Sequence, residues 1–379
     1  MVNKQRITEE FIELVSVPCQ SKKEGQIAEL IKKKLTELGI NFCCDDAHKA
    51  TGGECGNILA VLPATAGLEQ VPGIFFEAHM DSVDPATGTH VVRKDGVLYS
   101  DGTTTLGGDD KVGIAAMLEL IKVLQEEAIP HGKLELLFTI SEEIGCLGAR
   151  NLQPGFLTSA FGYCLDDSGH LGDITYASPY QYVLDVKVGG KSAHAGLEPE
   201  KGISAVMLSA RALAALPAYG RLDEETTLNV GLIRGGLASN IVAPACDFVI
   251  DMRSLNKDKL DKLRADTEER LRTVIEAGQG TVEITLKDFA PGVLLPMGHP
   301  CLELAGAAAG KLGVEQVNFQ RSGGCSDGNF FTALGVPTAV LGTGMSNIHT
   351  TAEYLREEDL VHTARWAVEI ARLAGEGKA

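Results

Sequence analysis

Five short segments of the chain end in residues that commonly bind metal ions. They are His79-Met80-Asp81, Asp109-Asp110-Lys111, Glu142-Glu143, Asp166-Asp167 and His349. Two imidazoles and several carboxylates, spread over about 270 residues, match the ligand set of a two-metal hydrolytic site. Each segment alone is weak evidence, because short motifs recur by chance. Their combination predicts that the protein is an enzyme.

The first segment combines a metal ligand with a residue able to orient it. His79 and Asp81 are two positions apart, so in extended chain their side chains point the same way. Asp81 is then placed to hold the far ring nitrogen of His79, a pairing typical of metal-bound histidine. The alternative for this segment alone is a surface histidine beside a helix cap.

The acidic pairs predict two different roles. Asp109-Asp110 precedes a helix that begins near Lys111, where aspartate is commonly a cap; the functional interpretation is a carboxylate that bridges two cations. Glu142-Glu143 follows a strand expected to be buried, and the two charges repel each other unless a positive group lies nearby. One of the two could bind metal while its neighbour reaches the attacking water. A solvated turn is the alternative.

The elements that must position these residues alternate between strand and helix. The segments 57–62 and 73–78 read as strands, apolar runs over 134–140, 161–165 and 336–341 as buried strands, and 112–127 has the apolar spacing of a helix. This alternation predicts an α/β sheet with helices on both sides. His79, Glu142, Asp166 and His349 each follow such a strand, and ligands in open α/β sheets bind beyond the carboxyl ends of strands. We therefore expect these side chains to converge.

A different order of elements separates two parts of that sheet. Strands are predicted over 180–188, 227–232, 247–253 and 281–287, with helices over 198–216 and 257–277. The order β-α-β-β-α-β is ferredoxin-like. The sequence therefore predicts a discontinuous catalytic domain, 1–178 and 290–379, interrupted by an inserted domain, 179–289. His194 and Arg253 lie in the insert, where an ordinary surface role is the alternative for each.

The composition of the chain argues against nucleic acid and membranes as binding partners. The chain has 379 residues and a net charge of −17, which argues against nucleic acid because no basic surface would offset phosphate repulsion. No apolar run approaches the length of about 20 residues that a membrane helix needs, and the charged N-terminus has no signal-peptide pattern. The nine cysteines form no Cys-x-x-Cys pair, which excludes a zinc knuckle and a thioredoxin-like motif. Their odd number and irregular spacing are typical of a reduced intracellular protein. We expect a soluble, cytoplasmic protein.

The motifs together resemble one enzyme family. His79-Met80-Asp81, the run Leu106 to Gly113, Ser141 to Gly145, Ser192 to Gly196, Asp251-Met252-Arg253 and Asn347-Ile348-His349 are similar to motifs of the M20 metallopeptidases. Their spacing is most similar to the peptidase T and peptidase T-like branch. The resemblance implies a three-layer αβα zinc-peptidase catalytic domain, with an inserted ferredoxin-like α+β domain that acts as lid and dimerisation domain.

The same resemblance implies a set of metal ligands. It predicts two Zn²⁺ per subunit, with Co²⁺ or Mn²⁺ able to substitute. His79 and Asp166 would bind one ion, Glu143 and His349 the other, and Asp109 both, with a cis peptide bond after Asp109. Since both residues of the Asp166-Asp167 pair fit the strand end, the choice between them stays open.

The resemblance also implies the remaining roles. Asp81 would orient His79, and Glu142 would be the general base for a metal-activated water. His194, donated across a dimer, would stabilise the oxyanion, Arg253 would hold the substrate carboxylate, and Asn240 is the third substrate-binding candidate. The expected partner is a short peptide and the expected activity that of a tripeptide aminopeptidase. A dipeptidase or an M20 deacylase acting on N-acyl amino acids is the alternative.

Two functions of other classes compete with this interpretation. Gly324 to Gly328 fits the G-x-S-x-G nucleophile elbow of serine hydrolases, with Ser326 followed in chain order by Asp359 and His362. The approach to Ser326 is polar, however, whereas an elbow follows a strand. The other competitor is a metal-dependent peptide-binding protein without turnover, although the candidate base and ligands are all present.

Overall fold

The chain folds into two compact units. The computed structural model describes residues 1–377. The first unit comprises residues 1–177, 294–322 and those from 326 onward, and the second comprises residues 178–293 and 323–325. None of the helices within 1–377 combines the length and apolar composition that crossing a bilayer requires.

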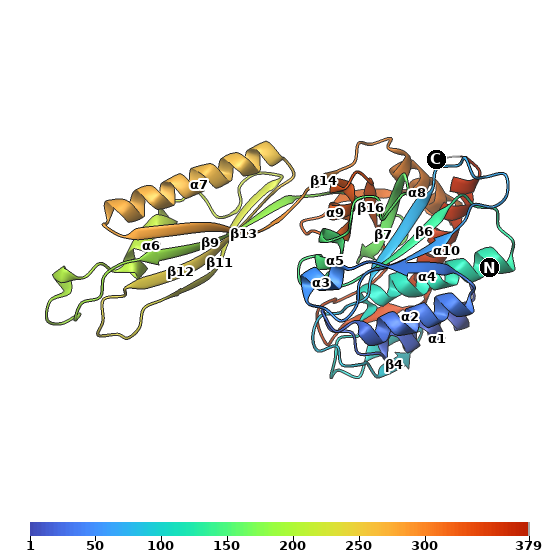
Figure 1. The fold of residues 1–379 in the computed structure, drawn as a ribbon, viewed down its shortest axis with the longest axis horizontal. Helices are drawn as coiled ribbons and strands as arrows, with labels where there is room; N and C mark the ends of the chain where they lie inside the picture. Colours follow the sequence, from blue (N-terminus) through green and yellow to red (C-terminus); the bar gives the residue numbers. More distant parts are fainter. Residues whose placement is uncertain (378–379) are drawn as a thin grey trace. The chain divides into compact units, whose positions relative to one another are not determined.

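A mixed sheet forms the centre of the first unit (Figure 1). Its strand order is β1-β2-β6-β3-β7-β16-β8-β14, and β15 pairs with β8. The neighbours β6, β3, β7 and β16 are parallel, so their carboxyl ends share one edge. A smaller sheet has the order β17-β5-β4. The strands are β1 (Asn41–Cys44), β2 (Ile58–Leu62), β3 (Ile74–His79), β4 (Val91–Lys94), β5 (Val97–Ser100), β6 (Leu134–Thr139), β7 (Phe161–Asp167), β8 (Asp173–Ser178), β14 (Val293–Leu294), β15 (Asn318–Arg321), β16 (Thr338–Gly342) and β17 (Tyr354–Arg356).

Helices cover both faces of the central sheet, as the alternation of side chains along β3 shows. Phe75 packs edge-on against Phe331 of α9, whereas its neighbour Phe76 stacks on Tyr163. The Tyr163 hydroxyl donates to a carbonyl of α8, at Cys301. Because adjacent strand residues point to opposite faces, α9 and α8 lie on opposite sides. The three-layer αβα prediction is therefore confirmed.

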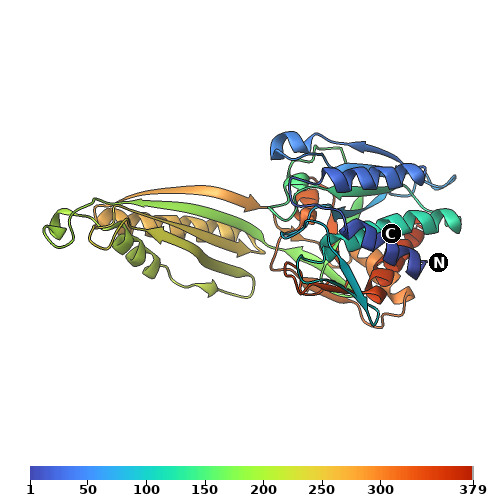
Figure 2. The same ribbon diagram turned by 90° about the horizontal axis from the view of Figure 1, so that it is seen from below.

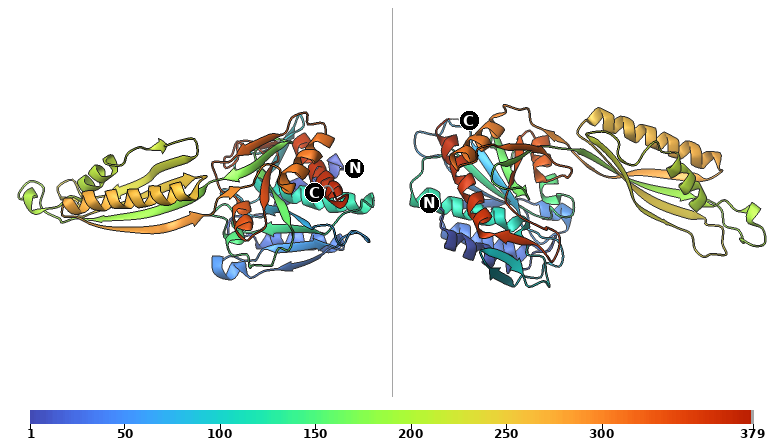
Figure 3. Two further views of the ribbon diagram at one scale, coloured as in Figure 1. Left: turned by 90° about the horizontal axis from the view of Figure 1, so that it is seen from above. Right: turned by 180° about the vertical axis from the view of Figure 1, so that it is seen from behind.

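The longest helices of this unit, α4 and α10, pack against each other (Figure 3). Trp366 of α10 also donates to the carbonyl oxygen of Ala305 in α8. The helices are α1 (Lys4–Val15), α2 (Gly25–Glu37), α3 (Ala47–Thr51), α4 (Gly108–Glu126), α5 (Leu147–Arg150), α8 (Pro300–Lys311), α9 (Asp327–Ala333) and α10 (Glu357–Gly375).

The second unit is a five-stranded sheet with two helices on one face (Figures 1 and 2). Its strand order β10-β11-β12-β9-β13 is antiparallel throughout, and with α6 and α7 it gives the ferredoxin-like connection predicted from the sequence. The elements are β9 (Tyr180–Gly189), η1 (Pro199–Lys201), α6 (Ala205–Ala214), β10 (Gly220–Arg221), β11 (Thr226–Gly235), β12 (Ala245–Ser254), α7 (Lys257–Ala277) and β13 (Thr281–Ala290).

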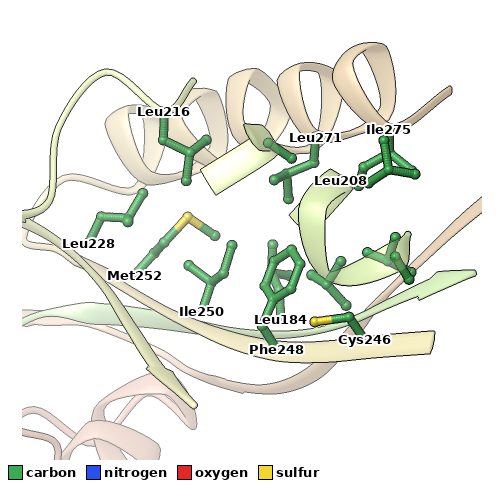
Figure 4. Packing of buried hydrophobic residues seen from close by; sticks show 14 of the residues in the cluster. Leu184, Leu208, Leu216, Leu228, Cys246, Phe248, Ile250, Met252, Leu271 and Ile275 are labelled. Carbon is green, nitrogen blue, oxygen red and sulfur yellow. The ribbon is translucent and has the colours of Figure 1, made fainter. Parts of the chain in front are cut away.

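Alternation along these strands produces the core of the second unit. Leu184, Val186 and Val188 of β9 are buried, as are Phe248 and Ile250 of β12. They face the inner sides of α6 and α7, where Leu208 and Leu271 complete the layer (Figure 4). The residues between them along each strand are more exposed, so the helices cover one face of the sheet.

One predicted helix is wrong in its extent. The segment 198–216 contains the short helix η1 and then α6, which begins only at Ala205. Pro199 and Gly202 interrupt the segment, and Ser204 caps α6 by accepting from the peptide N–H of Met207. Strand β7 also continues through Asp166 and Asp167 rather than ending before them.

Candidate metal centre

The predicted ligands meet at the carboxyl edge of the parallel strands. His79 is the last residue of β3, Asp166 lies near the end of β7, and Glu143 follows β6 by a short turn. His349 lies in the loop after β16, and Asp109 at the start of α4. All five belong to the first unit. The strand-end argument predicted the convergence of His79, Asp166, His349 and the Glu142-Glu143 pair, and Asp109 joins them from the start of α4.

The five side chains form two groups that share Asp109. His79, Asp109 and Asp166 each offer a ligand atom within 4.8 Å of the others, and so do Asp109, Glu143 and His349. Asp109 divides its oxygens between the groups: Oδ1 lies 2.8 Å from His79 Nε2, and Oδ2 lies 3.1 Å from His349 Nε2. The arrangement can hold two cations side by side, with one carboxylate common to both.

The surroundings of these groups fit cations. Glu143 Oε1 is buried and accepts no hydrogen bond from any residue of the described chain. His349 Nε2 lies 3.0 Å from Glu143 Oε2, and hydrogen bonds with Asp109 and Glu143 raise the pKa of His349 to about 10. Burial, together with the charge of Asp109, raises the pKa of Asp166 well above its ordinary value. These shifts mark an excess of buried negative charge, which divalent ions would neutralise.

The choice between Asp166 and Asp167 follows from the direction of β7. Asp166 Oδ1 lies 3.8 Å from His79 Nε2. Asp167 instead accepts from the peptide N–H of Gly169 at 2.8 Å and from the Thr175 hydroxyl at 2.6 Å. Adjacent residues of a strand face opposite ways, so Asp166 joins the cluster and Asp167 is engaged elsewhere.

The position of Asp109 depends on a residue that the sequence did not single out. Glu353 is buried, and its two carboxylate oxygens accept from the peptide N–H groups of Gly107 and Asp109 at 2.9 and 3.1 Å. Ser82 Oγ donates to the Asp109 carbonyl oxygen at 2.9 Å. The bond between Asp109 and Asp110 is cis, as the resemblance implied. Glu353 lies in a loop with no motif, so only the fold reveals its role.

Asp81 links the histidine to the glutamate pair. His79 Nδ1 lies 3.1 Å from the Asp81 carbonyl oxygen and 3.4 Å from its Oδ1. The Asp81 carboxylate also accepts from the peptide N–H groups of Glu142 and Glu143, at 3.0 and 3.3 Å. Burial opposes ionisation of Asp81, but the hydrogen bond and charge of His79 hold its pKa below the ordinary value. Asp81 thus fixes both the ring of His79 and the turn after β6.

A buried lysine and a half-buried serine complete this network. Lys111 Nζ donates to the Asp81 carbonyl oxygen at 2.8 Å and to Ser82 Oγ at 2.7 Å. The Ser21 hydroxyl donates to Asp81 Oδ2 at 2.6 Å. A lysine with no exposed surface is rare unless its charge is compensated. Lys111 was visible in the sequence as part of the Asp109-Asp110-Lys111 segment, whereas Ser21 had no signal.

Glu142 lies beside the two groups without belonging to either. Its carboxylate accepts from the Cys146 thiol at 3.2 Å, and burial raises its pKa well above the ordinary value. A carboxylate held with a raised affinity for protons, next to a site for cations, has the properties of a general base.

The three substrate-binding candidates lie in the second unit. His194 pairs with Ile241 in an isolated bridge, and the peptide N–H next to it, at Ala195, donates to the carbonyl oxygen of Asn240. Arg253, near the end of β12, donates to both oxygens of Asp251 and to the carbonyl oxygen of Gly323. His194 and Asn240 are therefore neighbours, and their roles toward a substrate stay predictions.

The serine hydrolase alternative lacks the expected local structure. Ser326 is the N-cap of the short helix α9, with the Asn329 side chain accepting from its peptide N–H. Asp359, the candidate acid of a serine hydrolase triad, has its Oδ1 atom 3.4 Å from Nδ1 of His170, a histidine that is not the triad candidate His362. A cap at the end of an irregular loop differs from the strand-to-helix elbow that exposes a nucleophile.

Comparison with known proteins agrees with this geometry. A family profile described as "Peptidase family M20/M25/M40" matches residues 75–373. The chain belongs to peptidase family M20. This family membership confirms the resemblance read from the motifs and makes the protein a hydrolase of peptide bonds.

Individual relatives extend the match to the whole chain. The Bacillus subtilis protein YqjE, itself described as uncharacterized, is 40% identical over 99% of this chain and 100% of its own. The aminopeptidase PepT of Bacillus cereus has a TM-score of 0.92 and 39% identity, covering 98% of this chain and 99% of its own. A tripeptidase of Staphylococcus aureus has a TM-score of 0.95 and 34% identity, covering 99% of this chain and 100% of its own.

Proposed function

We propose that the protein is a di-metal tripeptide aminopeptidase. The observation that carries this proposal is the sharing of Asp109 between two groups of potential ligands, with Glu142 held beside them. The aminopeptidase and the tripeptidase among its relatives support the substrate class.

The donor set indicates which residues would hold the ions. His79 and Asp166 would bind one, Glu143 and His349 the other, and Asp109 both. One nitrogen and two oxygen ligands for each ion suit zinc, and Co²⁺ or Mn²⁺ could replace it. When bound, the ions would lower the pKa of water from about 15.7 toward about 7 and polarise the scissile carbonyl group.

The residues of the chain would then do the following work. Glu142 accepts a proton from the attacking water and later delivers it to the nitrogen of the leaving amine. Asp81 holds the turn that carries Glu142 and keeps the ring of His79 in place. In the inserted domain, 179–289, Arg253 would bind the substrate carboxylate and Asn240 the peptide backbone. His194, supplied by a second copy of the chain, would stabilise the oxyanion.

Cellular context follows from the same reasoning. We infer a homodimer that associates through the inserted domain, because the family resemblance implies that His194 acts across such a dimer. We also infer a cytoplasmic location, because all nine cysteines, which lie within residues 1–377, are thiols rather than disulfides, as in a reducing compartment. Light scattering of the purified protein measures the mass directly. A strictly monomeric, fully active enzyme would contradict this part of the proposal.

A substrate panel tests the activity. Metal-replete protein is incubated with tripeptides, dipeptides and N-acylated amino acids, and the products are identified by mass spectrometry. The expected result is release of the N-terminal residue from tripeptides, abolished by removing the metals and restored by zinc. Preferential cleavage of dipeptides or N-acyl amino acids would instead identify a dipeptidase or deacylase of the same family.

A further inference from the structure

A third group of potential metal ligands lies next to the candidate metal centre. Glu142, Cys146 and Asp327 each offer one ligand atom, and these atoms all lie within 4.8 Å of one another. Glu142 and Cys146 come from the turn that follows β6, and Asp327 begins α9. Neither Cys146 nor Asp327 belongs to the two groups that share Asp109.

Asp327 is the member whose surroundings call for a cation. It is 1% exposed, and neither of its carboxylate oxygens accepts a hydrogen bond from another residue between 1 and 377. Two donors lie near Asp327 and offset part of the cost of its burial, the Thr139 hydroxyl and the Cys146 thiol. The Thr139 hydroxyl also donates to Glu77 at 2.9 Å, and the Cys146 thiol to Glu142 at 3.2 Å. A buried carboxylate whose nearby donors are shared with other carboxylates carries a desolvation cost, which a bound cation would offset.

We propose that Glu142, Cys146 and Asp327 form a third divalent metal site, which captures the base Glu142 and thereby inhibits the enzyme. The inhibitory effect rests on the proposed role of Glu142, whereas binding itself does not. On binding, a sulfur–metal bond replaces the thiol S–H bond, and the released proton passes to solvent. Glu142 then donates its electron pair to the ion and can no longer accept a proton from water.

The ligand types determine which ions fit. Tetrahedral zinc binds sulfur at about 2.3 Å and oxygen at about 2.0 Å, which places ligand atoms about 3.3 to 3.6 Å apart. The observed separation of 3.2 Å between Cys146 Sγ and Glu142 Oε1 is close to this range, and small side-chain movements would bring Asp327 into it. Thiolate favours zinc, cobalt and cadmium over Mg²⁺ or Ca²⁺, which prefer oxygen ligands.

Sulfur also gives the site a spectroscopic signature. The five ligands proposed for the first two ions offer only nitrogen and oxygen, so Co²⁺ bound there has no thiolate-to-metal charge-transfer band. We would add Co²⁺ to metal-free protein and record the near-ultraviolet spectrum after each equivalent. The band is expected to appear with the third equivalent, after the first two have bound without it.

Matched variants identify the sulfur. Cys146→Ser keeps a hydrogen-bond donor for Glu142 and should abolish the band, and Asp327→Asn should weaken third-ion binding at least tenfold. The control is the double variant Cys43→Ser, Cys44→Ser, which removes the exposed adjacent cysteines and should keep the band. A band absent from the wild type, retained in Cys146→Ser or lost in the control would overturn the proposal.

Inhibition is measured separately. Each protein is compared with its own activity at two equivalents of zinc, so that any effect of a substitution on the basal rate cancels. Excess Zn²⁺, but not the same excess of Mg²⁺, should inhibit the wild type, and Cys146→Ser should raise the inhibitory concentration at least tenfold. Equal inhibition of the wild type and of Cys146→Ser by Zn²⁺ would overturn the inhibitory role. Failure of the first two equivalents to bind would instead contradict the proposed function.

Discussion

The carboxyl edge of the first unit and the helix-covered sheet of the second unit differ in the kind of side chain that they bury. Among the described residues of the second unit no charged side chain is buried: its core is apolar, and its buried polar side chains are serines and threonines such as Ser209, Ser254 and Thr267. At the edge of the first unit the buried residues include His79, Asp81 and Lys111. Burying apolar surface stabilises a fold, whereas burying charge destabilises it unless the charge is compensated. One region therefore provides stability, and the other is arranged for chemistry.

The largest expected effect would come from the base at the charged edge. Glu142→Gln keeps the size of the side chain but removes its ability to accept a proton, so turnover should fall about 10²- to 10⁴-fold. Metal content should stay at two ions per chain, measured by elemental analysis. The matched control is Glu283→Gln, which alters an exposed residue of β13 and should leave turnover unchanged. Near-wild-type turnover of Glu142→Gln would remove this residue from the base role.

A substitution in the apolar core of the second unit should lower stability and leave the metal centre unchanged. Phe248 of β12 is 1% exposed and lies in the centre of its core, so Phe248→Ala should cost about 3 to 5 kcal/mol of local stability. Hydrogen exchange of β9 and β12 amides in increasing urea measures this loss, and the metal content should not change. Val249→Ala alters a partly exposed neighbour and should cost much less. Equal costs would show that the helix-covered face is not the source of stability.

Removal of metal should weaken only the charged edge. A ligand that binds the folded state stabilises it by about 4 kcal/mol at 1,000 times its dissociation constant, so a chelator should withdraw that stabilisation. Hydrogen exchange should then accelerate at the start of α4 and in the loop that carries His349, while β9 and β12 stay protected. If exchange accelerated equally in both units, bound cations would not be what distinguishes the first unit from the second.

The same contrast explains what the sequence could and could not reveal. The second unit follows from local periodicity, because alternate residues along β9 and β12 face one core. Four of the five ligand candidates of the first unit followed from residue types at strand ends, and Asp109 followed from an acidic pair at the start of a helix. Glu353 could not be found this way, because its importance comes from accepting hydrogen bonds of Gly107 and Asp109, far away in sequence. Interactions set by tertiary structure leave no periodic pattern.

The smallest expected effect concerns Glu10, a buried carboxylate of the first unit whose charge is neutralised by lysines of the same chain. Burial opposes ionisation of Glu10, but hydrogen bonds from Lys122 and Lys34 outweigh it and lower its pKa below the ordinary 4.5. A lowered pKa in the folded state adds stability above the unfolded value, and that stability disappears as the pH falls through the folded value. The stability advantage of wild type over Glu10→Gln should therefore be full near neutral pH and shrink below about pH 4.5.

Urea unfolding across this pH range measures the advantage, with the exposed neighbour Glu9→Gln as the control. Because lysines rather than metals neutralise Glu10, the advantage should be the same with and without chelator. A chelator-dependent advantage would show that Glu10 belongs electrostatically to the metal centre.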